Sequence, residues 1–269
     1  MLNKLLKLAA HLGVAFLLTV VTQIGGLIYL LVLVLIKRTV SRHHLKRTAC
    51  FTVLYLFATC VLVPPLAAIY GREPVLANGA IQAHSFFYKL TNRNYVTPRL
   101  NRVLEAAALD FQRKYPGVKL VHLDANFPFI DGFPLLPHLS HNDGKKIDIT
   151  LLYKDQVNTV TNRKPSVSGY GVYEGPENNE FDQISICKGS GYWQYDFPKY
   201  VTLGTINKDL TFSEEGTRAM TLSVLRQKSL KKLFIEPHLK TRLGLSNNKV
   251  RYHGCQAVRH DDHIHIQVE

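Results

Sequence analysis

The stretch HLSHNDGKKIDITLLY, residues 138–153, decides the fold together with RHDDHIHIQVE, residues 259–269. Each stretch contains a run in which apolar and polar residues alternate, the period of a β-strand that buries one of its faces. In the first run the face expected to point into the core carries Ile147, Ile149 and Leu151. The opposite face carries Lys146, Asp148 and Thr150.

Histidines are concentrated in the second stretch. His263 and His265 are two positions apart, so on a strand they share one face while Ile264 and Ile266 pack into the core. His260 is expected in the turn that leads into this strand. Neutral imidazole is a common metal ligand, although a His-x-His pair alone is more typical of a solvated polar edge at the C-terminus.

The first stretch supplies partners for these histidines. NDG, residues 142–144, is a turn signal, and such a turn can bring His141 back beside Asp148. Catalytic zinc sites use three protein ligands and leave one position for water, whereas structural sites close with four. His141, Asp148 and His265 would form an open site of this kind.

The two motifs together resemble those of the LAS metallopeptidases, a group that includes lysostaphin-like, D-alanyl-D-alanine and hedgehog-type domains. The closer likeness is to the penicillin-insensitive murein endopeptidases, whose motifs are His-x-x-His-x-x-Gly and His-x-x-His-x-His. The resemblance covers roughly residues 95–269 and none of the chain before them. The matching residues are His138, His141 and Gly144 in the first motif, and His260, His263 and His265 in the second.

The resemblance implies one Zn²⁺ per chain. Its ligands would be His141, Asp148 and His265, and His138 would be an additional ligand or would orient one. Asp143 would support a ligand imidazole in the same way, although an Asp in a turn more often caps backbone amides.

The resemblance also implies catalytic roles for two histidines. His263 would act as general base or stabilise the oxyanion, with His260 as a second active-site histidine. The sequence departs from the family where Gln256, Ala257 and Val258 replace expected aromatic residues, and residues 154–212 contain no matching motif.

The rest of the pattern predicts an α+β domain over residues 95–269, with helices packed on a small, largely antiparallel sheet. The resemblance implies the same architecture, the LAS or hedgehog-type peptidase fold. Residues 72–94 are expected to be a tether. Helices are expected after Pro98 and over 213–227, and further strands over 118–123, 233–235 and 264–268.

Residues 1–71 are expected to anchor the chain in a membrane through two transmembrane helices. Residues 8–36 and 48–71 carry no Asp, Glu, Lys or Arg, and about 20 apolar residues suffice to span a bilayer. Five Lys and Arg residues lie between them, over 37–47, and positive loops stay in the cytoplasm. This interpretation places the N-terminus and residues 72–269 outside, as a multi-pass protein of the inner (cytoplasmic) membrane with a periplasmic, extracytoplasmic catalytic domain.

Cysteine usage fits an exported domain. Cys187 and Cys255 are an even pair in a compartment that permits disulfides, so a bridge between them is one expectation. Two free buried thiols, or Cys255 as a zinc ligand, are the alternatives. Cys50 and Cys60 are expected to be packed thiols in the second span.

The charge distribution narrows the classes of partner that the protein is expected to bind. Residues 1–70 hold seven of the 33 Lys and Arg residues and none of the 20 Asp and Glu residues, so only +6 of the formal +13 lies beyond them. This charge, without a basic run interleaved with aromatics, argues against a nucleic-acid partner and suits an anionic polymer such as the cell wall.

The expected function follows from the resemblance. It implies a murein endopeptidase that hydrolyses peptide bonds in peptidoglycan stem-peptide cross-links. The alternatives are a D,D-carboxypeptidase and a non-catalytic wall-binding scaffold with a structural zinc.

Overall fold

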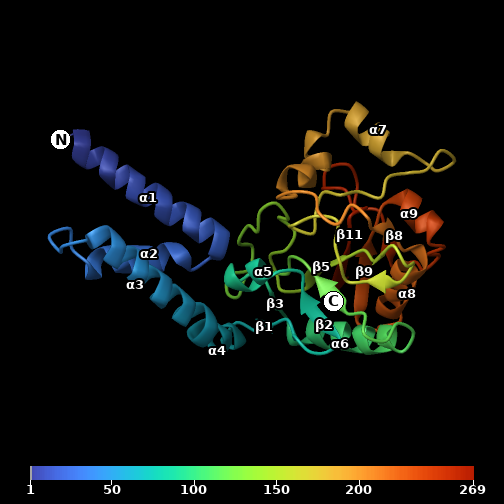
Figure 1. Cartoon of the computed structure of the whole chain (residues 1–269), viewed down its shortest axis with the longest axis horizontal. Helices are drawn as coiled ribbons and strands as arrows, with labels where there is room; N and C mark the ends of the chain where they lie inside the picture. Colours follow the sequence, from blue (N-terminus) through green and yellow to red (C-terminus); the bar gives the residue numbers. More distant parts are fainter. Residues whose placement is uncertain (1) are drawn as a thin grey trace.

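The computed structural model describes residues 2–269, which form a group of N-terminal helices and an α+β domain (Figure 1). The main sheet of the domain has six strands in the order β10-β9-β11-β5-β4-β2. Its three inner pairs are antiparallel and its two edge pairs, β10–β9 and β4–β2, are parallel. The strands are β2 (Ile81–Ala83), β4 (Leu120–His122), β5 (Lys146–Thr150), β9 (Leu230–Phe234), β10 (Val250–Arg251) and β11 (His263–Val268).

Two helices cover one face of this sheet. α6 (Pro98–Gln112) and α8 (Glu214–Leu225) begin after Thr97 and Ser213, whose side chains accept hydrogen bonds from backbone amides of the first turn. The apolar faces of both helices join the isoleucines of β5 and β11 in one core. The alternation in the sequence therefore assigned the core face of these strands correctly, and the opposite face carries the histidines.

Residues 72–94 are not a tether, contrary to the expectation from sequence. β2 pairs with β4 at the sheet edge, and Ile81 is fully buried in the core. The Arg72 side chain is only 2% exposed and donates to the Phe127 carbonyl. This strand could not be predicted from the sequence, because the three residues of β2 are too few to show the alternation of apolar and polar residues. The segment also contains β1 (Glu73–Pro74), which pairs with β3 (Tyr95–Val96), and α5 (Phe86–Leu90).

Residues 154–212 reach two parts of the domain: Tyr170 reaches Asp148 on the face of the sheet opposite α6 and α8, whereas Val160, Leu210 and Phe212 pack against the core. They contain a short helix, α7 (Gln183–Gly189), and the 3₁₀ helix η2 (Trp193–Val201). A small three-stranded sheet is formed by β6 (Tyr153–Lys154), β7 (Val160–Thr161) and β8 (Thr211–Phe212), and α9 (Pro237–Arg242) follows β9.

The first apolar stretch is a hairpin of two helices, and the prediction of one continuous helix over 8–36 was wrong. α1 (Leu2–Thr22) ends at Gln23, which has a φ of 67°, and α2 (Gly25–Leu35) returns beside it. A Cβ on Gly26 would lie 2.2 Å from the Ala15 carbonyl oxygen, so only glycine permits this close approach. An 11-residue helix is about 16 Å long, roughly half the thickness of a bilayer core.

The second apolar stretch is a continuous helix that begins earlier than predicted. α3 (His43–Phe57) passes through a π-helical turn, η1 (Ala58–Leu62), into α4 (Val63–Ile69). The π-helical turn lies directly before Pro64 and Pro65, which stand in the first turn of α4. Two helices are long and apolar enough to cross a membrane, Leu2–Thr22 and His43–Ile69.

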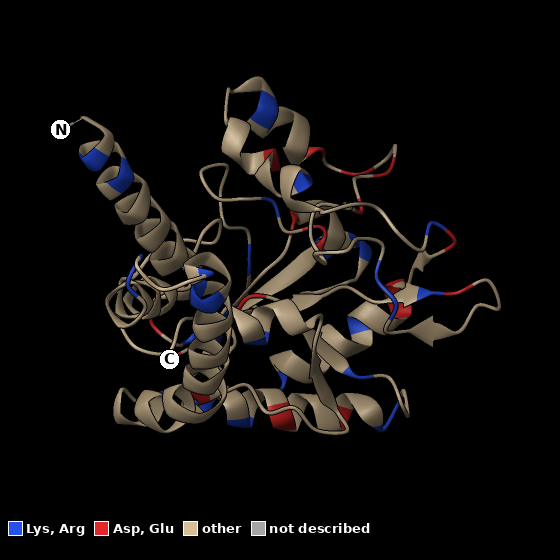
Figure 2. Ribbon diagram, turned by 60° about the vertical axis from the view of Figure 1, so that its left-hand side comes forward, with Lys and Arg blue, Asp and Glu red and all other residues tan. Residues whose placement is uncertain are grey.

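The hairpin places the two basic segments at the same end of the helical group. Arg38 Nη2 lies 3.0 Å from His11 Nε2, and the lysines of α1 lie near the N-terminus (Figure 2). The opposite end meets the domain, where Asn92 donates to the Thr22 carbonyl at 3.2 Å and the Phe129 amide donates to the Gln23 side chain at 3.1 Å. The start of α1 therefore lies on the side of the basic loop, away from the domain. The expectation that the N-terminus shares a side with residues 72–269 was wrong, because α1 and α2 form a hairpin.

Candidate metal centre and active site

The pairing of β5 with β11 brings the two sequence motifs together. His265 lies directly opposite Asp148 across the antiparallel pair, and His263 lies opposite Thr150. The loop that carries His141 is attached to β5 by Asn126, which accepts from the Gly144 amide at 3.1 Å and donates to the Lys146 carbonyl at 2.7 Å.

Three donor atoms form a compact triangle at this place. His141 Nε2 lies 3.0 Å from His265 Nδ1 and 3.2 Å from Asp148 Oδ1, and the last two atoms are 2.9 Å apart. Tetrahedral zinc with bonds of about 2.0–2.1 Å requires donors about 3.3 Å apart. The three observed distances differ from this spacing by a few tenths of an ångström. Small shifts of these buried side chains would therefore let them hold a metal ion.

A backbone carbonyl sets the tautomer of His141. Its Nδ1 lies 2.7 Å from the Ala125 carbonyl oxygen, which can only accept, so Nδ1 carries the proton. The lone pair of Nε2 then points into the triangle. A carbonyl that orients a histidine from its far nitrogen is the usual support of a metal ligand.

A second group of donors shares the same carboxylate. His138 Nδ1 lies 3.2 Å from Asp148 Oδ2, and His263 Nε2 lies 3.7 Å from that oxygen. These three side chains are also buried and can hold a metal ion. Asp148 therefore presents one oxygen to each pair of histidines.

Three residues of the site had no signal in the sequence. The Tyr170 hydroxyl donates to Asp148 Oδ2 at 2.8 Å from the long loop. Asp124 accepts two hydrogen bonds from the Arg93 guanidinium, at 2.6 and 2.8 Å, and lies 3.2 Å from His138 Nδ1. Neither spacing nor periodicity links these positions to the motifs, because each is placed by a loop.

The two remaining histidines of the second motif are held by carboxylates. Asp262 pairs with Nδ1 of His263 and accepts from the Gly171 amide at 2.6 Å, so Nε2 of His263 is turned toward Asp148. Glu236 accepts from the His260 amide at 2.9 Å, and the His260 ring lies 4.9 Å from that of His263.

Burial and neighbouring charges shift the pKa values of His265 and His263 in opposite directions. Burial lowers the pKa of His265 to about 3, so it is neutral at pH 7, as a metal ligand must be. Burial also disfavours protonation of His263, but the carboxylates of Asp148 and Asp262 raise its pKa to about 9. Burial opposes the ionisation of Asp148, yet the surrounding histidines hold its pKa well below the usual value.

Two further sequence candidates, Asp143 and Cys255, lie outside the metal groups. Asp143 accepts from the Lys145 amide at 2.9 Å and pairs with the Lys146 ammonium at 2.6 Å, so it caps the turn. Cys187 and Cys255 form a disulfide, which joins α7 to the loop before β11 and leaves neither as a ligand.

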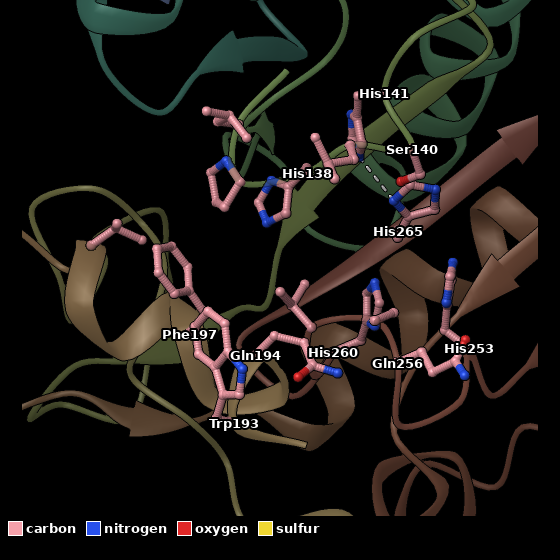
Figure 3. A pocket seen from close by; sticks show the side chains of 16 residues that line it. His138, Ser140, His141, Trp193, Gln194, Phe197, His253, Gln256, His260 and His265 are labelled. Carbon is pink, nitrogen blue, oxygen red and sulfur yellow. Dashed lines mark hydrogen bonds between the residues drawn. The ribbon is translucent and has the colours of Figure 1, made fainter. Parts of the chain in front are cut away.

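A cavity of about 690 Å³ opens beside the triangle (Figure 3). His141, His260 and His265 lie on one side of it, and Trp193 and Phe197 from η2 lie across from them. Residues Leu136, Leu139 and Val258 add further apolar wall, and no Lys, Arg, Asp or Glu belongs to its described lining. The wall of the cavity is therefore largely apolar and carries no charged side chain among its described residues.

Neither a protein-family model nor a curated protein matches this chain. Its class is thus defined by its own geometry, an α+β protein with buried His/Asp groups that can hold a metal ion.

Proposed function

We propose that the chain is a membrane-anchored, zinc-dependent peptidase that hydrolyses peptide bonds in peptidoglycan stem-peptide cross-links. The observation that carries the proposal is the triangle of His141, Asp148 and His265. Its donor set of two imidazoles and one carboxylate is the kind found in catalytic zinc sites. The peptidoglycan substrate rests on the likeness of the two histidine motifs to those of murein endopeptidases.

The three donors of the triangle would leave one coordination position of zinc open for water or substrate. No fourth His, Cys, Asp or Glu among residues 2–269 joins it, which favours an enzyme over a scaffold with a closed structural site. When bound, zinc would polarise the scissile carbonyl and lower the pKa of a bound water to about 7.

His263 is placed to move the proton. Its Nε2 is buried without a hydrogen-bond partner and faces the carboxylate of the triangle, while Asp262 fixes the ring through Nδ1. A zinc ion held by Asp148 would offset the charge of the carboxylate that raises the pKa of His263 to about 9. The neutral imidazole could then take a proton at Nε2 and return it to the leaving amine. His260 lines the cavity beside it and would position the peptide.

The cavity favours cleavage of internal bonds. A carboxypeptidase must bind the terminal carboxylate of its substrate, and the described lining contains no Lys or Arg to pair with it. Trp193 and Phe197 instead offer an apolar wall on which a peptide chain can lie. This observation supports the endopeptidase over the D,D-carboxypeptidase.

The orientation proposed for the protein in the membrane follows from the hairpin of α1 and α2. Both basic segments lie on the side of the helical group remote from the domain (Figure 1). The positive-inside rule therefore places the start of α1 with the basic loop in the cytoplasm, which replaces the expectation of an N-terminus outside. The domain is then extracytoplasmic, and the Cys187–Cys255 disulfide suits that oxidising compartment.

The test is the zinc content of the purified full-length protein, together with digestion of cross-linked muropeptides with and without a chelator. One tightly bound zinc and chelator-sensitive splitting of dimers would support the proposal. Release of free D-alanine would indicate the carboxypeptidase, zinc without cleavage would favour the scaffold, and absence of zinc would refute the proposed centre.

A further inference from the structure

We propose a second, weaker zinc site formed by His138, His263 and Asp148, whose occupation switches the enzyme off. The site itself is inferred from the geometry of these side chains. Its inhibitory effect rests on the proposed function, because it requires that His263 transfer the proton.

The two oxygens of Asp148 face different histidine pairs. Oδ1 lies 2.9 Å from His265 Nδ1 and 3.2 Å from His141 Nε2. Oδ2 lies 3.2 Å from His138 Nδ1 and 3.7 Å from His263 Nε2. A carboxylate that bridges two ions about 3.5–4 Å apart is the arrangement of two-metal sites.

An unsatisfied nitrogen points into the second group. His263 Nε2 has no hydrogen-bond partner among the described residues, and water cannot supply one from the surface because the side chain is 0% exposed. Buried polar atoms almost always have a partner, and the other ring nitrogen of His263 is already held by Asp262. A cation between His263 and Asp148 would satisfy this atom.

The charged side chains around Asp148 also favour the binding of a cation. Every ion pair of Asp148 within the described chain is with a histidine, and none is with Lys or Arg. The neighbouring Asp124 is already balanced by Arg93. A second cation therefore adds to a site that has a buried carboxylate and no permanent positive side chain against it.

The second site must be the weaker one. The 3.7 Å between His263 Nε2 and Asp148 Oδ2 exceeds the donor spacing of about 3.3 Å in tetrahedral zinc, so the side chains have to close around the ion. His138 must also give up its contact with Asp124. A first ion on Asp148 repels a second, and the second site therefore fills only at higher zinc concentration.

Occupation of this site removes the proton acceptor. A nitrogen whose lone pair binds zinc cannot take a proton, so an ion on His263 Nε2 blocks the proton transfer. Excess zinc is thus expected to lower the cleavage rate of the wild type by at least about 100-fold, the lower end of the range for general acid–base catalysis.

The experiment measures zinc bound per chain by equilibrium dialysis of the full-length protein in detergent, over nanomolar to millimolar zinc. The wild type is expected to bind two ions in separate phases. His138→Ala, and in a second variant His263→Ala, are expected to bind only the first. His122→Ala is the matched control, because His122 is similarly buried in the same sheet, donates a hydrogen bond to the Leu123 carbonyl and belongs to neither group.

Two readouts locate the second ion and its effect. Paramagnetic resonance of the Mn²⁺-loaded protein should show a spin-coupled pair in the wild type and uncoupled ions in His138→Ala. The cleavage rate at high zinc divided by the cleavage rate at low zinc, taken within each variant, should fall well below one for the wild type and stay near one for His138→Ala.

Each contrary result has a distinct meaning. A wild type that stops at one zinc, or a His138→Ala protein that still binds a coupled second ion, would overturn the second site and leave the peptidase proposal standing. Two ions without inhibition would overturn the switch. A wild type that binds no zinc would instead refute the proposed function itself.

Discussion

At the scale of single residues, Asp148 connects all parts of the site. It lies on β5, accepts from Tyr170, and presents one oxygen to His265 and the other to His138. The sequence predicted Asp148 and His265 as partners because the alternation along two strands assigns their faces, and it added His141 through the turn signal at residues 142–144. It could not predict Tyr170, since the register of a loop against a sheet has no local pattern.

His265→Ala and His263→Ala should separate binding from catalysis. Loss of His265 removes a corner of the donor triangle, so tight zinc binding and activity should both disappear. Loss of His263 should leave the tight zinc in place and lower the cleavage rate by roughly 10²–10⁴-fold, the usual contribution of a general acid–base group. Metal content and cleavage rate of both variants check this, and loss of the tight zinc from His263→Ala would reverse the assigned roles.

Tyr170→Phe should weaken the metal centre without removing a ligand. The variant loses the hydroxyl that donates to Asp148 at 2.8 Å, and loss of such a support typically costs about 10–100-fold in metal affinity or activity. Tyr88→Phe is the control, because Tyr88 is equally buried but donates to the Ser168 carbonyl. Equal zinc affinity and rate in Tyr170→Phe and the control would show that this hydrogen bond is not needed.

Lys164 makes stability depend on pH. Burial lowers its pKa to about 7, against a usual value of about 10.4 in an unfolded chain. Between these values the unfolded chain binds the extra proton, so this residue makes stability rise with pH. The stability of Lys164→Met relative to the wild type should be greatest below pH 7 and decline toward pH 10. Thermal unfolding of both proteins from pH 6 to 10 measures it, and parallel curves would contradict the assignment.

At the scale of elements, the sequence predicted those with a clear period and missed those without one. The caps and apolar spacing of α6 and α8 are local signals, and both helices form where expected. The three-residue β2 and the helices α7 and η2 have no such signal. Their positions depend on contacts with distant residues, which a local pattern does not encode.

The disulfide should stabilise the wall of the cavity. It holds α7 to the loop before β11, and Gln194 of η2 donates to the Cys255 carbonyl at 3.4 Å. Changing Cys187 and Cys255 together to Ser should lower the free energy of unfolding by about 2–4 kcal/mol. Because Trp193 is the only tryptophan and lies in this wall, its fluorescence should also change. An unchanged unfolding temperature would mean that packing alone holds α7.

At the scale of the whole molecule, the N-terminal helices are part of the folded structure. Val63 and Ala67 of α4 are buried against Tyr95, and the Tyr55 hydroxyl of α3 donates to the Leu90 carbonyl at 2.6 Å. The helices therefore contact the segment 72–94 directly, and no free linker separates them from the domain.

Removal of residues 1–71 should destabilise the domain. The chain would lose the apolar cover of Tyr95, worth about 2 kcal/mol for one buried aliphatic side chain, which corresponds to a fall of roughly 4–8 °C in unfolding temperature. Differential scanning calorimetry of the full-length and shortened proteins in the same detergent tests this. Equal unfolding temperatures would show that the domain is independent of the helices.

The sequence by itself determined which residues of β5 and β11 face the core and which carry the histidines, because alternation along a strand is a local property. It also determined that residues 1–71 are apolar helices with basic ends. Only the tertiary structure decided that Asp148 serves two histidine pairs, that Tyr170 supports it and that α1 and α2 form a hairpin. These features depend on side chains far apart in the chain, which meet only when the loops and strands have packed.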